Sequence, residues 1–140
     1  MSELKHIVIP LLYNSSLIFK SNDTKIYRDA VLLTPGLWAD MISNSNILYK
    51  SEKLTEYATN WSNNIIDLHH SHHPLHLCGT VRNQRWGYSD KLGKYAVLGD
   101  LYIERCLSAG KEVATLIDLG LVNQLSVERY HPSSRCYNLH

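Results

Sequence analysis

Gly-Leu-Val-Asn-Gln-Leu-Ser-Val-Glu, residues 120–128, is the segment around which the expected fold is built. It follows a helical pattern in which apolar residues share one face and Ser108 is the expected N-cap. Gly120 stands where a helix usually ends, and residues 121–130 then predict a strand. Strand alternation places Ser126 on the face opposite to its apolar neighbours. On spacing alone, a solvent-facing serine is the simpler interpretation of this position.

A histidine-rich segment, Asp-Leu-His-His-Ser-His-His-Pro-Leu, occupies residues 67–75 upstream of the serine. In a strand over residues 65–70, His70 shares a face with apolar side chains and His69 shares the other face with an aspartate. A general base has to be held firmly, which favours His70, with His69 and His72 as alternatives. Imidazole titrates near neutrality, so a histidine and a serine together supply the parts of a serine nucleophile.

The rest of the pattern predicts an α+β domain. Apolar and alternating runs predict further strands over residues 6–12, 24–33, 76–84 and 95–103, and residues 87–93 predict a turn. Helical spacing predicts a helix through residues 37–42, with Thr34 as its cap and Pro35 in its first turn, and another over 51–60. We therefore expect a curved, mostly antiparallel sheet or barrel with about three flanking helices.

Size and composition fit a single domain, residues 1–140. The apolar fraction of 44% is that of an ordinary globular protein. A net charge of +1, with acids and bases interspersed, argues against nucleic acid or a membrane surface as the main partner. No apolar run approaches the roughly 18 residues that span a bilayer. The cysteines, Cys78, Cys106 and Cys136, are widely spaced, so reduced cytosolic thiols are expected.

The histidines also allow a second chemistry, a metal site. The cluster consists of His69, His70, His72, His73 and His76, with Cys78 close behind. It lacks the HExxH spacing and the carboxylate or thiolate partners that are typical of zinc sites. We therefore expect no metal and no cofactor, and a His-rich metal-binding protein is the alternative. Cys78 lies among apolar residues and is interpreted as a small buried hydrophobe rather than a nucleophile.

Four stretches together resemble the caudovirus prohead maturation proteases, the capsid-assembly serine peptidases of tailed phages and related archaeal viruses. The stretches are residues 29–38 (DAVLLTPGLW), 67–81 (ending GTV), 99–103 (GDLYI) and 110–127 (ending LSV). The resemblance covers roughly residues 28 to 129 in order and spacing. This family is related in fold to the herpesvirus assemblins, so the resemblance implies an assemblin-like fold for the whole domain.

The resemblance also implies a function, that of a serine endopeptidase with Ser126 as nucleophile and His70 as general base. The implied substrates are segments of the viral major capsid protein and of the scaffold, and the protease itself. The implied setting is the procapsid, within the host cytoplasm, where the protease would self-associate. Neither nucleic acid nor a membrane is an implied partner.

The third member of the triad is the point at which the chain departs from the family pattern. Family members continue into a further strand that supplies an acidic residue, whereas here the sequence after the serine strand is short, which puts that C-terminal strand in question. Glu128 lies roughly 7 Å from Ser126 along one strand face and is the predicted third member. His131, His69 and His72 are alternates, and Asp100 is more distant. The competing hypothesis is a catalytically inactive or truncated protease fold that serves as a scaffold or assembly protein.

Overall fold

The computed structural model describes residues 5–19, 23–39, 46–57, 62–68, 73–131 and 134–140. Within them, one sheet of eight strands has the order β1-β9-β10-β6-β7-β8-β3-β2. The bounds are Lys5–Pro10 for β1, Ser15–Phe19 for β2, Thr24–Leu33 for β3, Ser62–Asp67 for β6, Leu77–Ser89 for β7, Lys94–Glu104 for β8, Gln124–His131 for β9 and Ser134–Leu139 for β10. All neighbours pair antiparallel except β10 and β6, which are parallel.

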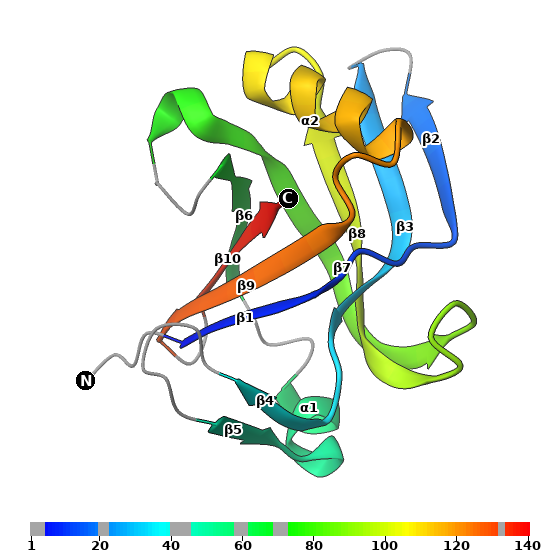
Figure 1. Cartoon of the computed structure of the whole chain (residues 1–140), viewed down its shortest axis with the longest axis vertical. Helices are drawn as coiled ribbons and strands as arrows, with labels where there is room; N and C mark the ends of the chain where they lie inside the picture. Colours follow the sequence, from blue (N-terminus) through cyan, green and yellow to red (C-terminus); the bar gives the residue numbers. More distant parts are fainter. Residues whose placement is uncertain (1–4, 20–22, 40–45, 58–61, 69–72, 132–133) are drawn as a thin grey trace.

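The smaller elements lie at the ends of this sheet (Figure 1). Strands β4 (Gly36–Ala39) and β5 (Asn46–Tyr49) form a separate two-stranded sheet, and helix α1 (Ser51–Tyr57) follows directly. A 3-10 turn, Pro74–His76, precedes β7, and helix α2 (Ser108–Asp118) connects β8 to β9. The fold is therefore α+β, as predicted from the sequence.

The sheet curls so far that its two edges are joined by one short connection, yet it is not closed into a barrel. The edge strands β1 and β2 are consecutive in the chain, and residues 11–14 lie between them. Leu11 N donates to Asn123 O at 2.8 Å on one side, and Asn14 N donates to Arg28 O at 2.9 Å on the other. The curved, mostly antiparallel sheet is confirmed, and the barrel alternative is wrong because β1 and β2 do not pair.

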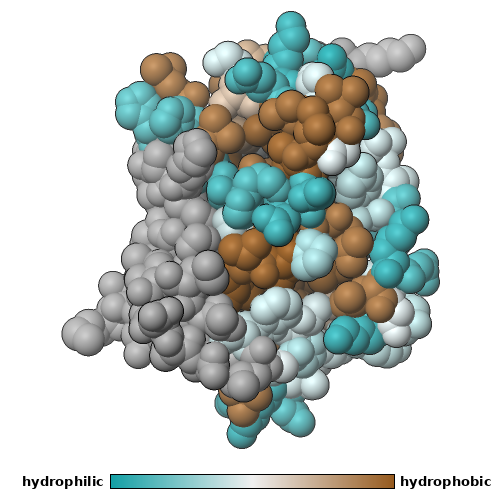
Figure 2. Space-filling model, viewed as in Figure 1, coloured by the Kyte–Doolittle hydropathy of each residue, from teal (hydrophilic) through white to brown (hydrophobic). Residues whose placement is uncertain are grey.

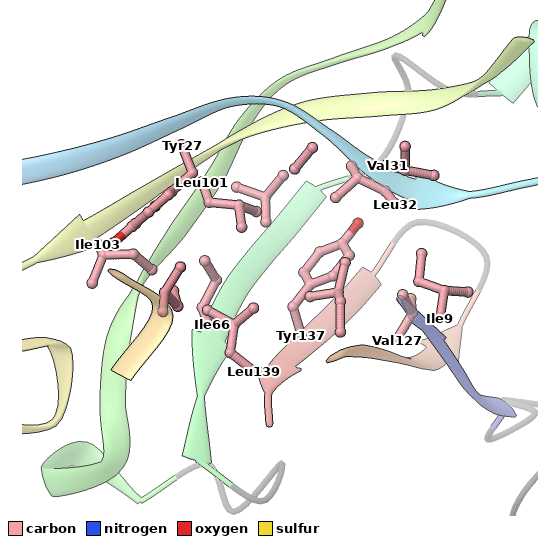
Figure 3. Packing of buried hydrophobic residues seen from close by; sticks show 14 of the residues in the cluster. Ile9, Tyr27, Val31, Leu32, Ile66, Leu101, Ile103, Val127, Tyr137 and Leu139 are labelled. Atoms are coloured by element: carbon pink, nitrogen blue, oxygen red, sulfur yellow. The ribbon is translucent and has the colours of Figure 1, made fainter. Parts of the chain in front are cut away.

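The core lies inside the curl. Figure 3 shows Ile66, Tyr137 and Val127 pointing from β6, β10 and β9 toward Leu101 and Val31 on the opposite half of the sheet. All of these side chains are buried, and burying each large apolar side chain stabilises the fold by about 1.5–3 kcal/mol. Core and non-core residues alternate over residues 65–67 of β6, 125–127 of β9 and 137–139 of β10.

Helix α2 closes one end of the core. Its buried face consists of Ala109, Gly110, Val113, Ala114 and Ile117. Gly110 allows this close approach, because a Cβ atom there would lie 2.1 Å from the carbonyl oxygen of Glu104. The helix ends as predicted, with Gly120 just beyond it at a φ of 74°. Its start differs from the prediction, since the N-cap is Leu107 and Ser108 is already helical.

The predicted helix through residues 37–42 is wrong where the structure describes it. Residues 36–39 form β4, in which Leu37 pairs with Leu48 of β5. Gly36 has a φ of 130°, which no helix accepts, and the Trp38 indole donates to Thr34 O at 2.8 Å. The described residues therefore contain two α-helices, α1 and α2, rather than about three.

Two strands of the eight-stranded sheet, β2 and β10, were not predicted, and neither were β4 and β5 of the separate sheet. The β10 strand matters most for the site, because it follows the serine strand and lies between β9 and β6. The turn expected over residues 87–93 is shorter than predicted, since β7 continues to Ser89. Strand β6 ends at Asp67, and the predicted His70 lies outside the described residues.

Candidate functional site

Ser126 lies in the second strand from one edge of the sheet. In β9 its register partners are Val8 of β1 and Asn138 of β10. Leu125 and Val127 point into the core, so Ser126 lies on the non-core face, as strand alternation predicted. Its exposed fraction is nevertheless 0%, so the interpretation as a solvent-facing serine is wrong.

Two further buried polar residues share this face with Ser126. Tyr137 pairs with both Val127 and Ile66 inside the core. Asn138 and Asp67 each follow one residue later on their strands, so both lie on the opposite, non-core face. Their exposed fractions are 7% and 1%. We call Ser126, Asn138 and Asp67 the polar row, because it crosses β9, β10 and β6 in order.

The polar row has a defined width. Neighbouring strands lie about 4.8 Å apart, so the backbones at Ser126 and Asp67 are about 10 Å apart, with Asn138 between them. Polar side chains that are this deeply buried need hydrogen-bond partners, since an unsatisfied one costs about 1–3 kcal/mol. The row is therefore a place where a hydroxyl, an amide and a carboxylate are held in fixed positions.

A cavity of about 300 Å³ lies at the Asp67 end of the row, lined by Ile65, Asp67, His73, Pro74 and Leu77. Ile65 and Asp67 alternate with the core residue Ile66, so the cavity opens on the same face as the polar row. His73 is exposed at its rim, where Nδ1 accepts a hydrogen bond from Leu75 N at 3.2 Å.

Cys78 lies beside Asp67 but is not a nucleophile in this setting. Its side chain is buried, and Sγ donates to His76 O at 3.5 Å. Burial, and secondarily the negative charge of Asp67, raise the pKa of the Cys78 thiol to about 12. Only the thiolate is a good nucleophile, so the interpretation of Cys78 as a small buried hydrophobe is confirmed.

The other predicted site residues are described only in part. His69, His70 and His72 lie outside the described residues. Glu128 and His131 belong to β9, where only their backbone is described, and Glu128 pairs with His6 and Cys136. The distance from Ser126 to any of these side chains therefore stays a prediction, and so do their roles.

Asp67 and Asn138 are the site residues that sequence reasoning missed. Asp67 carried a signal, because it ends an apolar strand just before the histidines. Asn138 carried none, since β10 was not predicted. No group of three His, Cys, Asp or Glu side chains within the described ranges could hold a metal ion. The histidines of residues 69–72 are not among them, so the absence of a metal site stays a prediction.

A second polar cluster surrounds Asp100 on β8. Both neighbouring strands bulge beside it, β3 at residues 28–29 and β7 at residues 83–84. Its carboxylate accepts from Asp29 N at 3.1 Å and lies 3.7 Å from both Arg28 and Arg85. Asp29 and Asn83 have positive φ angles of 54° and 58°. Every charged group here has an opposite partner, so the cluster holds the two bulges together.

Neither the surface nor the comparisons single out one class of partner. The face seen in Figure 2 carries brown apolar areas divided by a teal hydrophilic band. Within the described part of the chain, no helix is both long and apolar enough to cross a membrane. No protein-family model, curated protein or solved structure matches the chain significantly.

Proposed function

We propose that this chain is a serine endopeptidase that matures viral procapsids, with Ser126 as nucleophile and His70 as general base. The polar row is the observation that supports this most. Ser126, Asn138 and Asp67 are buried together outside the core, where apolar side chains would stabilise the sheet more simply. A hydroxyl fixed beside hydrogen-bonding groups is what triad chemistry requires.

In the proposed reaction, Ser126 Oγ attacks a peptide carbonyl carbon while His70 takes the hydroxyl proton. The tetrahedral intermediate then breaks the C–N bond, and His70 gives the proton to the leaving amine. A water molecule attacks the resulting ester, with His70 again taking a proton. Collapse of the second intermediate releases the carboxylic acid and returns a proton to Ser126 Oγ. The proposal uses no metal or cofactor.

The third member of the triad, which would orient His70, has more candidates than the sequence alone suggested. Glu128 is the predicted third member, and the polar row adds Asp67 and Asn138. Removing the residue that orients the histidine costs about 10⁴-fold in turnover in a well-studied serine protease. Glu128→Gln, Asp67→Asn and Asn138→Ala, measured separately, would identify it as the variant with a loss of about that size.

The proposed substrates rest on the family resemblance alone. They are segments of the major capsid protein, scaffold segments and the protease itself, inside a procapsid in the host cytoplasm. We also propose that the protease self-associates there. Neither nucleic acid nor a membrane has a part in this proposal.

The test is co-expression of the chain with its neighbouring shell and scaffold proteins, followed by intact mass measurement. Cleavage by the wild type that is lost in Ser126→Ala and in His70→Ala would support the proposal. Ser16→Ala is the matched control, because Ser16 is an exposed serine on β2. Cleavage that survives in Ser126→Ala would refute the proposed nucleophile.

The burial of Ser126 favours a second candidate, a catalytically inactive protease fold that serves in assembly. A substrate carbonyl reaches a side chain with no exposed surface only after the covering groups move. In this candidate the shell proteins bind the chain but stay uncleaved. A fluorophosphonate reagent separates the two functions, since it labels Ser126 in an active enzyme and leaves an inactive fold unlabelled.

A further inference from the structure

The cavity beside the polar row is placed where a substrate side chain would be expected. Ile65 and Asp67 bring it onto the face that carries Ser126, and the connection from β6 to β7 supplies His73, Pro74 and Leu77. Ser126 lies two strands away, about 10 Å across the sheet. An extended peptide advances about 3.3 Å per residue, so when one of its carbonyls meets Ser126, a side chain about three residues away lies over the cavity.

The lining indicates what the cavity would accept. Ile65, Pro74 and Leu77 supply an apolar wall. Asp67 is almost wholly buried, so its carboxylate offers little surface to a cationic side chain. The volume of about 300 Å³ lies at the small end of the range for ligand pockets, which suits one side chain rather than a cofactor.

From this placement we infer that the cavity is the specificity pocket of the protease and that it takes an apolar side chain of leucine or methionine size. This inference rests on the proposed function of Ser126. The side chain lies about three residues from the scissile bond, and its burial against Ile65 and Leu77 positions the carbonyl for attack. One methylene in such a pocket changes kcat/KM by about 10- to 200-fold, so leucine should exceed alanine by at least about 10-fold.

Peptide cleavage tests the inference when the size of the substrate side chain and the size of the pocket are both varied. The wild type is given peptides that differ only at the position about three residues from the scissile bond, as leucine, methionine, lysine or alanine. Ile65→Phe should fill the cavity and shift the preference from leucine to alanine, whereas Ile65→Ala should enlarge it and favour larger side chains. Leu121→Phe is the matched control, because Leu121 is 69% exposed and lies outside the cavity.

The outcomes separate the two proposals. Cleavage that depends on Ser126 but keeps its preference in both Ile65 variants overturns the pocket and leaves the nucleophile standing. A preference for lysine also overturns the apolar pocket. Cleavage that survives in Ser126→Ala refutes the proposed function instead.

When no cleavage is seen, a binding measurement tests the proposed pocket. Ser126→Ala with labelled methyl groups is titrated with N-acetyl-leucinamide and, separately, with N-acetyl-glycinamide. The leucine compound should shift the NMR signals of Ile65 and Leu77 but not that of Ile18, which is exposed on β2. If the Ile65 and Leu77 signals do not move up to the solubility limit of the leucine compound, the pocket is refuted.

Discussion

Cys78 is expected to react with iodoacetamide at pH 8 about 1,000-fold more slowly than an ordinary exposed thiol. Burial, with a smaller effect of the Asp67 charge, raises the pKa of the Cys78 thiol from 9.0 to about 12. The thiolate is the reacting species, and its fraction falls tenfold for each unit of pKa. Three units therefore give about 10³, and the poor access of reagent to a buried sulfur slows the reaction further.

The assay is alkylation over time followed by peptide mass mapping. Cys106 is exposed and serves as the reference within the same molecule. In concentrated urea both cysteines should be alkylated at similar rates, which shows that the fold causes the protection. Alkylation of folded Cys78 within about tenfold of the Cys106 rate would refute the reasoning, and a cysteine nucleophile would then have to be considered.

Three further predictions concern stability, each measured by urea denaturation. Gly79→Ala should cost more than about 3 kcal/mol, because a Cβ atom there would lie 1.8 Å from a backbone oxygen of β8. Gly93→Ala is the control for this variant, because its Cβ atom meets no atom within 4 Å and it should cost only the roughly 1–2 kcal/mol of its positive φ. Asp100→Ala should cost about 2 kcal/mol, since it removes a partner of two partly exposed arginines, of which Arg85 keeps Asp29, and the acceptor of the Asp29 backbone N–H. A loss below about 0.5 kcal/mol would contradict this. Because burial raises the pKa of the Cys78 thiol from 9.0 to about 12, the free energy of unfolding contains a contribution of at most about 4 kcal/mol below pH 9. This contribution should be lost as the pH rises from 9 toward 12. The loss of stability over the same pH range should be smaller in Cys78→Ala.

The elements that were predicted well are those whose pattern is local. Strand β3 matches residues 24–33 because Ile26 and residues 30–33 are apolar and the run ends at Thr34 and Pro35. Helix α2 was found because its apolar residues recur at helical spacing before Gly120. The helix predicted after Thr34 does not form. A capping residue followed by proline also begins non-helical segments, and the positive φ of Gly36 is incompatible with a helix, so a strand forms instead.

Strand β10 and the polar row could not be predicted for a different reason. Residues 134–139 have few β-formers, and what makes them a strand is their pairing with β9 and β6. The sequence predicted the place of Ser126 on its strand, but the neighbours of Ser126 depend on the order of strands in the sheet. The antiparallel pairing of β10 with β9 brings Asn138 beside Ser126, and the parallel pairing of β10 with β6 adds Asp67 one strand further on. Long-range pairing such as that of β10 with β6 leaves no periodic signal in the sequence.

The insertion of β10 also sets the geometry that a catalytic base would need. If β9 and β6 were neighbours, Ser126 and Asp67 would be only about 4.8 Å apart at the backbone, and no ring would fit between their side chains. With one strand between them, the separation of about 10 Å is long enough for an imidazole that lies above Asn138 and makes a hydrogen bond of about 2.8 Å at each end. The line from Ser126 to Glu128 runs along β9, whereas the line from Ser126 to Asp67 runs across the sheet. A histidine oriented by Glu128 would therefore be turned by about a right angle from one oriented by Asp67. Because one ring cannot satisfy both arrangements, a large loss of turnover in Asp67→Asn should be accompanied by a small loss in Glu128→Gln, or the reverse.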